Sequence, residues 1–389
     1  MTEQSSERAP RISIGIRAWN EESVIRKTLE SVFQQSLFEE LARRGERCEV
    51  LCIPNGCTDR TAEVAAAVFA EQAYSHPFAN AFTCHVTEIK EAGRNHTWNA
   101  FVHSLSSPDA EFLFIMDSDI LFNQRETLFN LYSALLNHSE AAIASDRAIK
   151  DIQFKPRKSL IDRISLATTD MTATIEGQIT GQLYGIRSSV ARRLYLPKDL
   201  GIDDGFIKAV VCTDFFLRPM TPARIIVPPN AAHVYEAYTS VKEILNNQKR
   251  QMIGQAIVHV LLDHLRQLPS TQRWDLSSTL RDKDEQDPDW LKKLIDAHLG
   301  RARYFWRIFP DALTFRFKRW LKMSGGRRVT HFPAAVAGFV VTLVACARAH
   351  RHFRRGQMHY WPKASRENIQ RLNVDEPANA AVQPQPAKT

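Results

Sequence analysis

Two carboxylates stand one residue apart in this 389-residue chain, in the segment Asp117-Ser118-Asp119. Residues 112–116, which precede them, are all apolar, as expected of a strand buried in a sheet. Two carboxylates at this spacing can share a hard divalent cation, whose other ligands are water and phosphate oxygens. We therefore predict that Asp117 and Asp119 hold Mg²⁺ or Mn²⁺ against a diphosphate, where the ion would stabilise a leaving nucleotide. Taken alone, the pair could also be two solvated acids at the end of a strand.

Three further polar segments follow apolar runs earlier in the chain: Arg17–Glu22, Pro54–Asp59 and Ala92–Asn99. Each has an ordinary alternative, since Asn-Glu-Glu is a common helix start and Asn-Gly a common turn. The carboxyl ends of parallel strands meet at one edge of a sheet, and ligands bind there. We therefore expect the four segments to lie together.

The elements that must position these segments alternate between short apolar runs and helical patterns. The predicted strands are Ile12–Ile16, Val50–Ile53, Phe82–Val86, Glu111–Met116 and Ala141–Ser145. Between them, helical spacing places Ile25, Leu29, Val32 and Phe33 on one face, and a second helix is expected from Thr58 as its N-cap. Such alternation predicts an α/β fold with a mostly parallel sheet and helices on both faces.

Taken together, the four segments resemble family 2 inverting glycosyltransferases, which have the Rossmann-like GT-A fold. The order and spacing match over residues 11–220. The resemblance implies a nucleotide-sugar donor, usually a UDP-sugar, and a divalent metal. It assigns the donor side to Ala18, Asn20 and Glu22 near the nucleotide, Asn55 at a base-reading position, Arg94 facing the pyrophosphate, and Asp117. Many members have two acids where Pro54-Asn55 stand, so base contacts here would use an amide, which both donates and accepts hydrogen bonds.

The resemblance also includes a later acidic pair, Asp203-Asp204, which matches the Glu-Asp pair of the family. It implies that Asp204 is the base that removes the proton of the acceptor hydroxyl, with Asp203 tuning its charge and position. Without the upstream motifs, the pair would read as a turn with two solvated acids. The acceptor side is assigned to Gly181, Gln182 and Arg250. The Gln-x-x-Arg-Trp motif of processive members is not matched around Arg250, which favours transfer of a single sugar.

The composition limits the protein to a globular class. The chain is 44% hydrophobic and 24% charged, with 15 Gly and 18 Pro, which excludes collagen-like, low-complexity and disulfide-stapled chains. Its six cysteines form no CxxC pair, so neither a zinc ribbon nor a redox motif is present, and scattered thiols indicate a reducing compartment. The polar first ten residues predict no secretory signal.

Positive charge is concentrated near the C-terminus. Residues 301–355 contain 13 Lys and Arg and one acid, whereas the rest of the chain is net negative. This region includes Phe332–Ala347, 16 residues without a charge, which is shorter than the ~20 that span a bilayer and could also be a buried core helix. The basic flanks, with Trp306 and Trp320, favour peripheral or monotopic attachment to the cytoplasmic face of a membrane and hence a lipid or lipid-linked glycan acceptor. Nucleic acid is not expected, because no binding motif accompanies the basic residues.

These predictions divide the chain into five parts. They are a flexible N-terminus (1–10), a GT-A nucleotide-sugar-binding catalytic domain (11–235), a helical region with a basic-aromatic stretch (236–325), a membrane-associating segment (326–365) and a disordered tail (366–389). Two other functions remain open. A nucleotidyltransferase would need a glycine-rich loop after the first strand, where none stands, and a catalytically silent binding module would be favoured by loss of the acids, which are present.

Overall fold

The computed structural model describes residues 9–170, 177–301 and 325–355, with a few isolated positions between 302 and 324. Most of the predicted flexible N-terminus, most of the basic-aromatic stretch and the whole of the predicted tail lie outside the described residues.

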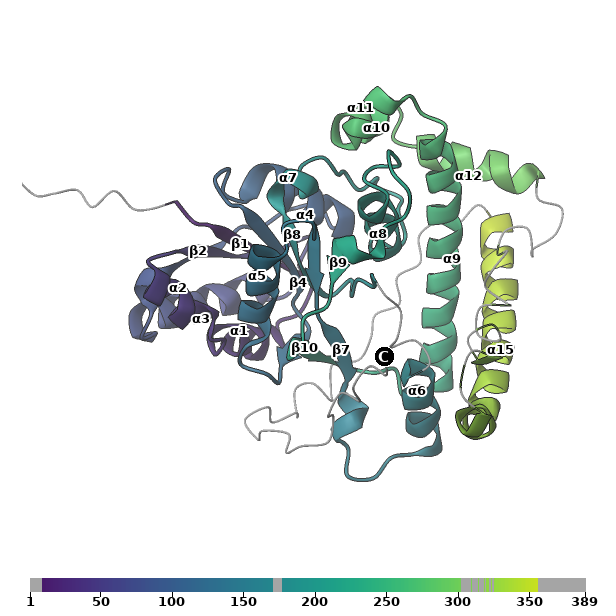
Figure 1. Cartoon of the computed structure of the whole chain (residues 1–389), viewed down its shortest axis with the longest axis horizontal. Coiled ribbons are helices and arrows are strands. Elements are labelled where there is room, and N and C mark those ends of the chain that lie inside the picture. Colours follow the sequence, from purple (N-terminus) through teal and green to yellow (C-terminus); the bar gives the residue numbers. More distant parts are fainter. Residues whose placement is uncertain are drawn as a thin grey trace, which may run out of the picture.

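A seven-stranded sheet forms the centre of the molecule, with strand order β3-β2-β1-β4-β8-β6-β9 (Figure 1). Its strands are β1 (Ile12–Ala18), β2 (Cys48–Pro54), β3 (Phe82–Val86), β4 (Phe112–Asp117), β6 (Ile143–Ser145), β8 (Leu183–Arg187) and β9 (Ile225–Ile226). All neighbouring pairs are parallel except the two that involve β8. The mostly parallel sheet and the five predicted strands are therefore confirmed, with ends that differ by one or two residues.

A second, three-stranded sheet lies beside the first. It consists of β5 (Ile120–Phe122), β10 (Ala232–Tyr235) and β7 (Arg147–Lys150), in that order. Since β5 follows β4 after only two residues, the turn that contains Ser118 and Asp119 joins the two sheets. The Thr28 hydroxyl donates to the Ser118 carbonyl oxygen (2.8 Å), which fixes this turn on the first helix.

Helices cover both faces of the large sheet and pack on two hydrophobic cores. One core lies under α1 (Ile25–Phe33), α2 (Leu37–Arg44), α3 (Thr61–Ser75) and α5 (Thr127–Asn137). The predicted inward face of α1 is confirmed, because Ile25, Leu29, Val32 and Phe33 are all buried. The prediction for the next helix was wrong in one detail. It begins at Thr61 rather than Thr58, because Thr58 bonds to Asn20 and the Asp59 carboxylate accepts the Thr61 N–H.

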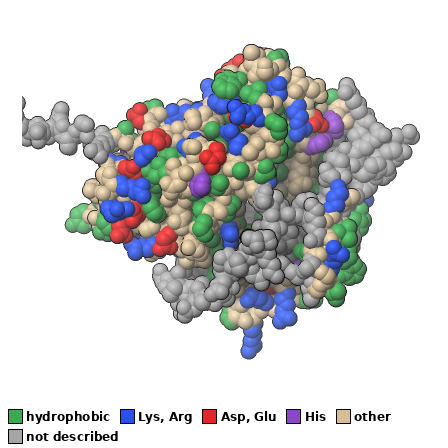
Figure 2. All heavy atoms as spheres, viewed as in Figure 1, with side chains coloured by type: hydrophobic (Ala, Val, Ile, Leu, Met, Phe, Trp, Pro, Cys, Tyr) green, Lys and Arg blue, Asp and Glu red, His purple; other side chains and the backbone are tan. Residues whose placement is uncertain are grey.

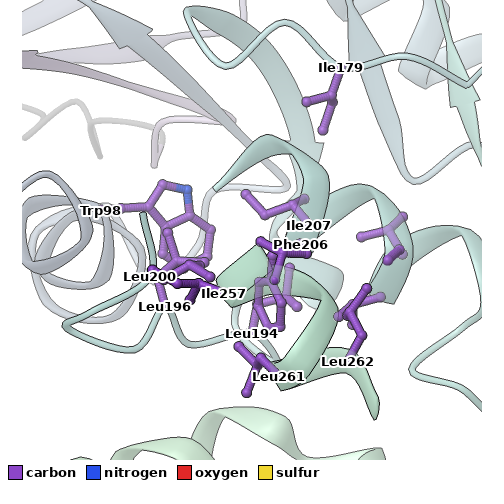
Figure 3. Close-up of a cluster of buried hydrophobic side chains, with 14 of the residues drawn as sticks. Trp98, Ile179, Leu194, Leu196, Leu200, Phe206, Ile207, Ile257, Leu261 and Leu262 are labelled. Atoms are coloured by element: carbon purple, nitrogen blue, oxygen red, sulfur yellow. The ribbon is translucent and has the colours of Figure 1, made fainter. Parts of the chain in front are cut away.

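The other core lies under α4 (Arg94–Ala100), α7 (Ser188–Ala191), α8 (Asp204–Cys212) and α9 (Val241–Arg266). Figure 3 shows Phe206 and Ile207 of α8 facing Ile257 and Leu261 of α9. The long helix α9 therefore shares its core with the sheet domain. It begins with a capping box, in which Ser240 and Glu243 bond to each other's backbone N–H groups.

The remaining helices are α6 (Leu160–Asp170), α10 (Ser270–Trp274), α11 (Leu276–Gln286), α12 (Trp290–Arg301) and α15 (Gly325–Arg354). The predicted helical C-terminal region is thus confirmed. Helix α15 packs along α9 and also contacts α6. Within the described residues, His331–Arg354 is the one stretch that is long and apolar enough to cross a membrane.

Candidate active site

Four elements bring opposite charges together at the edge where β1 and β4 end. Arg17 lies near the end of β1, Asp117 ends β4, and Asp203 is the N-cap of α8. One guanidinium nitrogen of Arg17 donates to Asp117 Oδ1 (2.7 Å) and the other to Asp203 Oδ2 (3.2 Å). The Arg17 side chain is only 4% exposed, so this pairing is screened little by water. Residues almost 190 positions apart are thereby fixed at one point.

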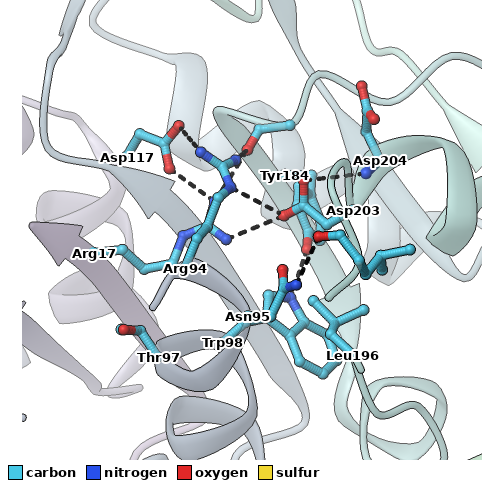
Figure 4. Close-up of polar contacts among 12 residues, drawn as sticks. Arg17, Arg94, Asn95, Thr97, Trp98, Asp117, Tyr184, Leu196, Asp203 and Asp204 are labelled. Carbon is cyan, nitrogen blue, oxygen red and sulfur yellow. Dashed lines mark hydrogen bonds and ion pairs between the residues drawn. The ribbon is translucent and has the colours of Figure 1, made fainter. Parts of the chain in front are cut away.

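Arg94, at the start of α4, closes the same cluster from the opposite side (Figure 4). Its Nη1 donates to Asp117 Oδ2 (2.9 Å), its Nε to Asp203 Oδ2 (3.3 Å) and its Nη2 to the Gly181 carbonyl oxygen (2.5 Å). Burial lowers the pKa of Arg94, but Asp117 and Asp203 outweigh that effect and raise it, so the guanidinium stays charged. Both oxygens of Asp117 are therefore bonded to arginine.

The two neighbouring acids of α8 have opposite properties. Burial raises the pKa of Asp203, but Arg94 and Arg17 outweigh burial and hold it at about 2. The pKa of Asp204 is raised above its ordinary value of 3.8, first by burial and then by the charge of Asp203. Figure 4 shows the Asp204 carboxylate pointing away from the two guanidinium groups. Asp203 is thus a fixed anion, whereas Asp204 has the higher proton affinity that a general base needs.

The residues predicted on the acceptor side lie next to these acids. A Cβ added to Gly181 would lie 3.4 Å from Arg94 Nη2 and 3.6 Å from Asp203 Oδ1, so the glycine lets the chain pass close to both. The Gln182 carbonyl oxygen accepts the Asp117 N–H (2.8 Å). Arg250 of α9 is close enough for its pKa, which burial lowers, to respond also to Asp204 and Asp203.

The residues predicted near the nucleotide form a separate group that ties the loops after β1 and β2 together. The Asn55 amide donates to the Ala18 carbonyl oxygen (2.7 Å), and its oxygen accepts the Gly93 N–H (3.2 Å). The Asn20 side-chain oxygen accepts the Thr58 N–H (2.7 Å). Glu22 binds both the backbone and the guanidinium of Arg60, which lowers the pKa of Glu22. In this structure, therefore, these side chains hold the loops after β1 and β2 against each other.

Asp117 and Asp119, the predicted metal pair, offer carboxylate oxygens, which suit a hard cation. In this structure, however, both oxygens of Asp117 are already bonded to arginine. Asp119 is half-buried, two residues beyond Asp117 across the β4–β5 turn. Among the residues that the structure describes, no three His, Cys, Asp or Glu side chains are grouped closely enough to hold a metal ion. A cation would thus take its other ligands from water or a diphosphate, and at Asp117 it would replace an arginine contact.

Two residues of this edge received no role from the sequence. One is Arg17. The sequence does carry a signal for it, because Arg17 is a charged residue in the otherwise uncharged strand Ile12–Ala18, and a buried charge needs a partner. His233 of β10 is the other. Its Nδ1–H donates to Asp146 Oδ2 (2.6 Å), its Nε2 lies 3.1 Å from Gln182 Oε1, and both His233 and Asp146 are fully buried. No sequence motif marks this pair.

We expect replacement of His233 by Ala to destabilise the protein by about 2–3 kcal/mol, because it leaves the buried Asp146 carboxylate without one of its donors. Urea unfolding followed by circular dichroism measures the change. The control is His85→Ala, since His85 is exposed on β3 and its loss should change the unfolding free energy by under about 0.5 kcal/mol. Equal stability of the two variants would show that the His233–Asp146 pair does not hold this edge.

Comparison with known proteins assigns the sheet domain to a family. Residues 13–193 match Glycosyl transferase family 2. This domain belongs to glycosyltransferase family 2. The match covers β1 to β8, and hence Arg17, Arg94, Asp117 and Gly181, but it ends before Asp203 and Asp204.

Several solved structures are similar to this chain over about two thirds or more of its length. The mannosyltransferase PcManGT from Pyrobaculum calidifontis, in complex with GDP-Man and Mn²⁺, is 17% identical, with 88% of this chain and 87% of that chain covered and a TM-score of 0.49. TarS 1-349 from S. aureus, in complex with UDP-GlcNAc, is 12% identical, with 89% and 92% covered and a TM-score of 0.41. Glucosyl-3-phosphoglycerate synthase from Mycobacterium tuberculosis, with Mn²⁺, UDP-glucose and phosphoglyceric acid, is 14% identical, with 67% and 81% covered and a TM-score of 0.43. No curated protein matches the sequence significantly.

Proposed function

We propose that this family 2 glycosyltransferase inverts the anomeric centre as it moves one sugar from a nucleotide-diphosphate sugar, with UDP-sugars favoured, to a hydroxyl of a membrane lipid or lipid-linked glycan. The observation that carries the proposal is the cluster of Arg17, Arg94, Asp117 and Asp203 beside Asp204, at the strand ends of a family 2 domain. Proteins similar in fold have been crystallised with GDP-Man, UDP-GlcNAc and UDP-glucose. The site of action would be the cytoplasmic face of a membrane.

In this mechanism the chain supplies a base and compensating positive charge. Asp204 takes the proton of the acceptor hydroxyl as its oxygen attacks the anomeric carbon from the face opposite the diphosphate. Asp203 cannot compete for that proton, because its pKa is held at about 2. Arg94, Arg17 and Arg250 lie close to Asp203, and preorganised cations there would lower the cost of the negative charge that develops on the leaving group. A divalent ion held by Asp117 and Asp119 would supply further charge stabilisation to the diphosphate.

The experiment that tests the function is release of free nucleoside diphosphate from a panel of UDP- and GDP-sugars, with Mn²⁺ or EDTA, and with a membrane lipid extract as acceptor. We expect release from one donor that depends on metal and is stimulated by lipid. No release from any donor, together with no binding of UDP in calorimetry, would reject the enzyme and favour a catalytically silent module.

The metal pair is tested in the same assay. We expect Asp119→Ala to lower Mn²⁺-dependent release by about 10²-fold or more, because one of the two carboxylates for the ion is lost. Asp109→Ala removes an exposed acid before β4 and should leave release unchanged. Direct Mn²⁺ binding, followed by electron paramagnetic resonance, should weaken in Asp119→Ala alone. Equal Mn²⁺ affinity in the two variants would show that the ion binds elsewhere.

A further inference from the structure

Along most of its length, helix α15 is packed with small side chains inward and large apolar side chains outward, whereas near its C-terminal end the large side chain of Phe353 is buried. The buried positions that face the protein include Ala335, Gly338, Thr342, Ala345 and Ala349. The exposed apolar positions are Val329 (76%), Phe332 (49%), Val336 (39%), Val340 (52%), Leu343 (39%) and Val344 (39%). Both sets recur at three- and four-residue spacing, so each forms one stripe along the helix. We call the second set the outward stripe.

This arrangement is the reverse of what water imposes on a surface helix. In water, an amphipathic helix turns its large apolar residues to the core and its polar residues outward. Where the surrounding medium is itself apolar, small residues mediate the contact between helices and large apolar residues face the medium. From Val329 to Ala347 the exposed face of α15 carries no charged side chain among the described positions. Figure 2 shows hydrophobic side chains gathered along the α15 edge of the molecule, at the right.

Positive charges stand at both ends of the outward stripe. Arg328 is exposed at one end, and Arg351, Arg354 and Arg355 are exposed at the other. The sequence contains no acid between Asp311 and Glu367, so nothing within this segment neutralises them. Two copies of the chain that paired through α15 would bring arginines together without acids to match, which disfavours a dimer at this face. Anionic lipid headgroups, in contrast, complement a stripe with cationic ends.

The packing of α15 against α9 determines how α15 can lie relative to a bilayer. The Arg348 guanidinium donates to Asn246 Oδ1 of α9 (3.0 Å), and Ala345, Cys346 and Ala349 share a core with α9. Since α9 presents Gln255, His259 and Asp263 at exposed or half-buried positions, a membrane-crossing α15 would carry these polar groups toward the hydrocarbon. The stripe, about 23 Å long at the rise of an α-helix, can instead lie flat along the surface.

We propose that α15 is an in-plane membrane-docking helix, whose outward stripe enters the apolar side of the headgroup region while its terminal arginines bind anionic headgroups. Helix α6, which contacts α15, also carries two exposed apolar residues, Leu160 and Ile164. This inference rests on the proposed function and specifies its partner. Arg250, near Asp203 and Asp204, and Asn246, bonded to Arg348, lie on one helix, so the bilayer is one helix away from the acceptor side.

Binding of the full chain to vesicles of phosphatidylcholine, with and without phosphatidylglycerol, tests the surface. We expect binding that phosphatidylglycerol strengthens, and a loss of about tenfold or more in the double variant Val340→Glu/Leu343→Glu. Both side chains are exposed, so the fold should tolerate the changes, which circular dichroism checks. Tyr74→Glu, which changes a 94% exposed aromatic residue on α3, is the matched control and should bind as the natural protein does.

The orientation is tested with a fluorescent amino acid placed at positions 329, 336, 343 and 347 in turn, and quenched by lipids labelled at shallow or deep positions. An in-plane helix gives the same shallow depth at all four positions, whereas a spanning helix gives the greatest depth at 336 and 343. Unchanged vesicle binding in the double variant would overturn the proposal. A second result would also overturn it. The natural protein would fail to bind vesicles and would sediment as a dimer, and the double variant would sediment as a monomer. A second copy of the chain would then be the partner that covers the outward stripe.

Failure of this inference and failure of the proposed function are distinguishable. Nucleoside diphosphate release in detergent does not require docking, and the double variant should retain it. Transfer without vesicle binding would reject the docking helix alone. Vesicle binding without transfer would reject the enzyme alone.

Discussion

Replacement of Asp204 by Asn should lower the rate of sugar transfer by about 10²–10⁴-fold, the range that a positioned general base contributes. Asparagine keeps the size of the side chain and can still accept the Gly205 N–H, which Asp204 Oδ1 accepts at 2.7 Å, but it cannot take up the proton. Donor affinity, measured by calorimetry with the intact nucleotide sugar, should stay unchanged. Asp289→Asn, at an exposed acid between α11 and α12, is the matched control. Undiminished transfer in Asp204→Asn would remove this residue as the base.

The pH profile gives an independent test of the same assignment. Burial and the charge of Asp203 raise the pKa of Asp204, so transfer should fall, as the pH is lowered, at a pH above the ordinary carboxylate value of 3.8. In Asp203→Asn the neighbouring negative charge is gone, and this acidic limb should move to lower pH. A limb that stays in place would show that Asp203 does not set the proton affinity of the base.

Replacement of Arg17 by Met should destabilise the protein by about 3 kcal/mol and also impair transfer, because two buried carboxylates lose one of their cations. Arg94 still contacts both Asp117 and Asp203, which keeps the cost near the lower end for a broken buried pair. Urea unfolding at neutral pH measures it. The control is Arg125→Met, whose exposed ion pair with Glu39 should contribute under about 1 kcal/mol. Equal stability of the two variants would show that the Arg17 pairs contribute no more than a surface pair.

The contacts between Asp203 and its arginine partners should also make the free energy of unfolding depend on pH in the acid range. The pKa of Asp203 is held at about 2 in the folded protein, below the ordinary value of 3.8. The stability that this difference supplies is fully present above pH 3.8 and is lost as the pH falls toward about 2. In Arg17→Met the difference shrinks, so a smaller part of the stability should depend on pH in that window. A steeper dependence in the variant would contradict the assignment of Arg17 as a cation for Asp203.

Much of the framework could be predicted from the order of residue types along the chain. Apolar runs of strand length marked β1, β2, β3, β4 and β6, because the strands of a mostly parallel sheet covered on both faces consist mainly of apolar residues. The polar segments that follow them lie near one edge, since parallel strands end together, and the structure bonds Arg94 to Asp117 across that edge. The N-cap prediction at Thr58 failed because a contact with Asn20, 38 residues away, fixes that residue outside the helix.

Other features depend on contacts between distant residues. A sequence can show that Arg17 is charged within an otherwise uncharged strand, but its two partners lie 100 and 186 residues away, and only the folded chain selects them. The different pKa shifts of Asp203 and Asp204 have the same origin, because neighbouring residues of one type differ only in what surrounds them.

Helix α15 shows most clearly the difference between what the sequence determines and what only the tertiary structure determines. The sequence by itself determined an apolar run, Phe332–Ala347, with basic residues on both sides, and that pattern fits a core helix as well as a membrane helix. Only the tertiary structure decided which stripe of the helix meets α9. Small residues allow the close approach of two helices, so Ala335, Ala345 and Ala349 face inward and the larger valines and Leu343 remain outside. Composition fixes how apolar a helix is, whereas packing fixes which of its faces is left for a partner.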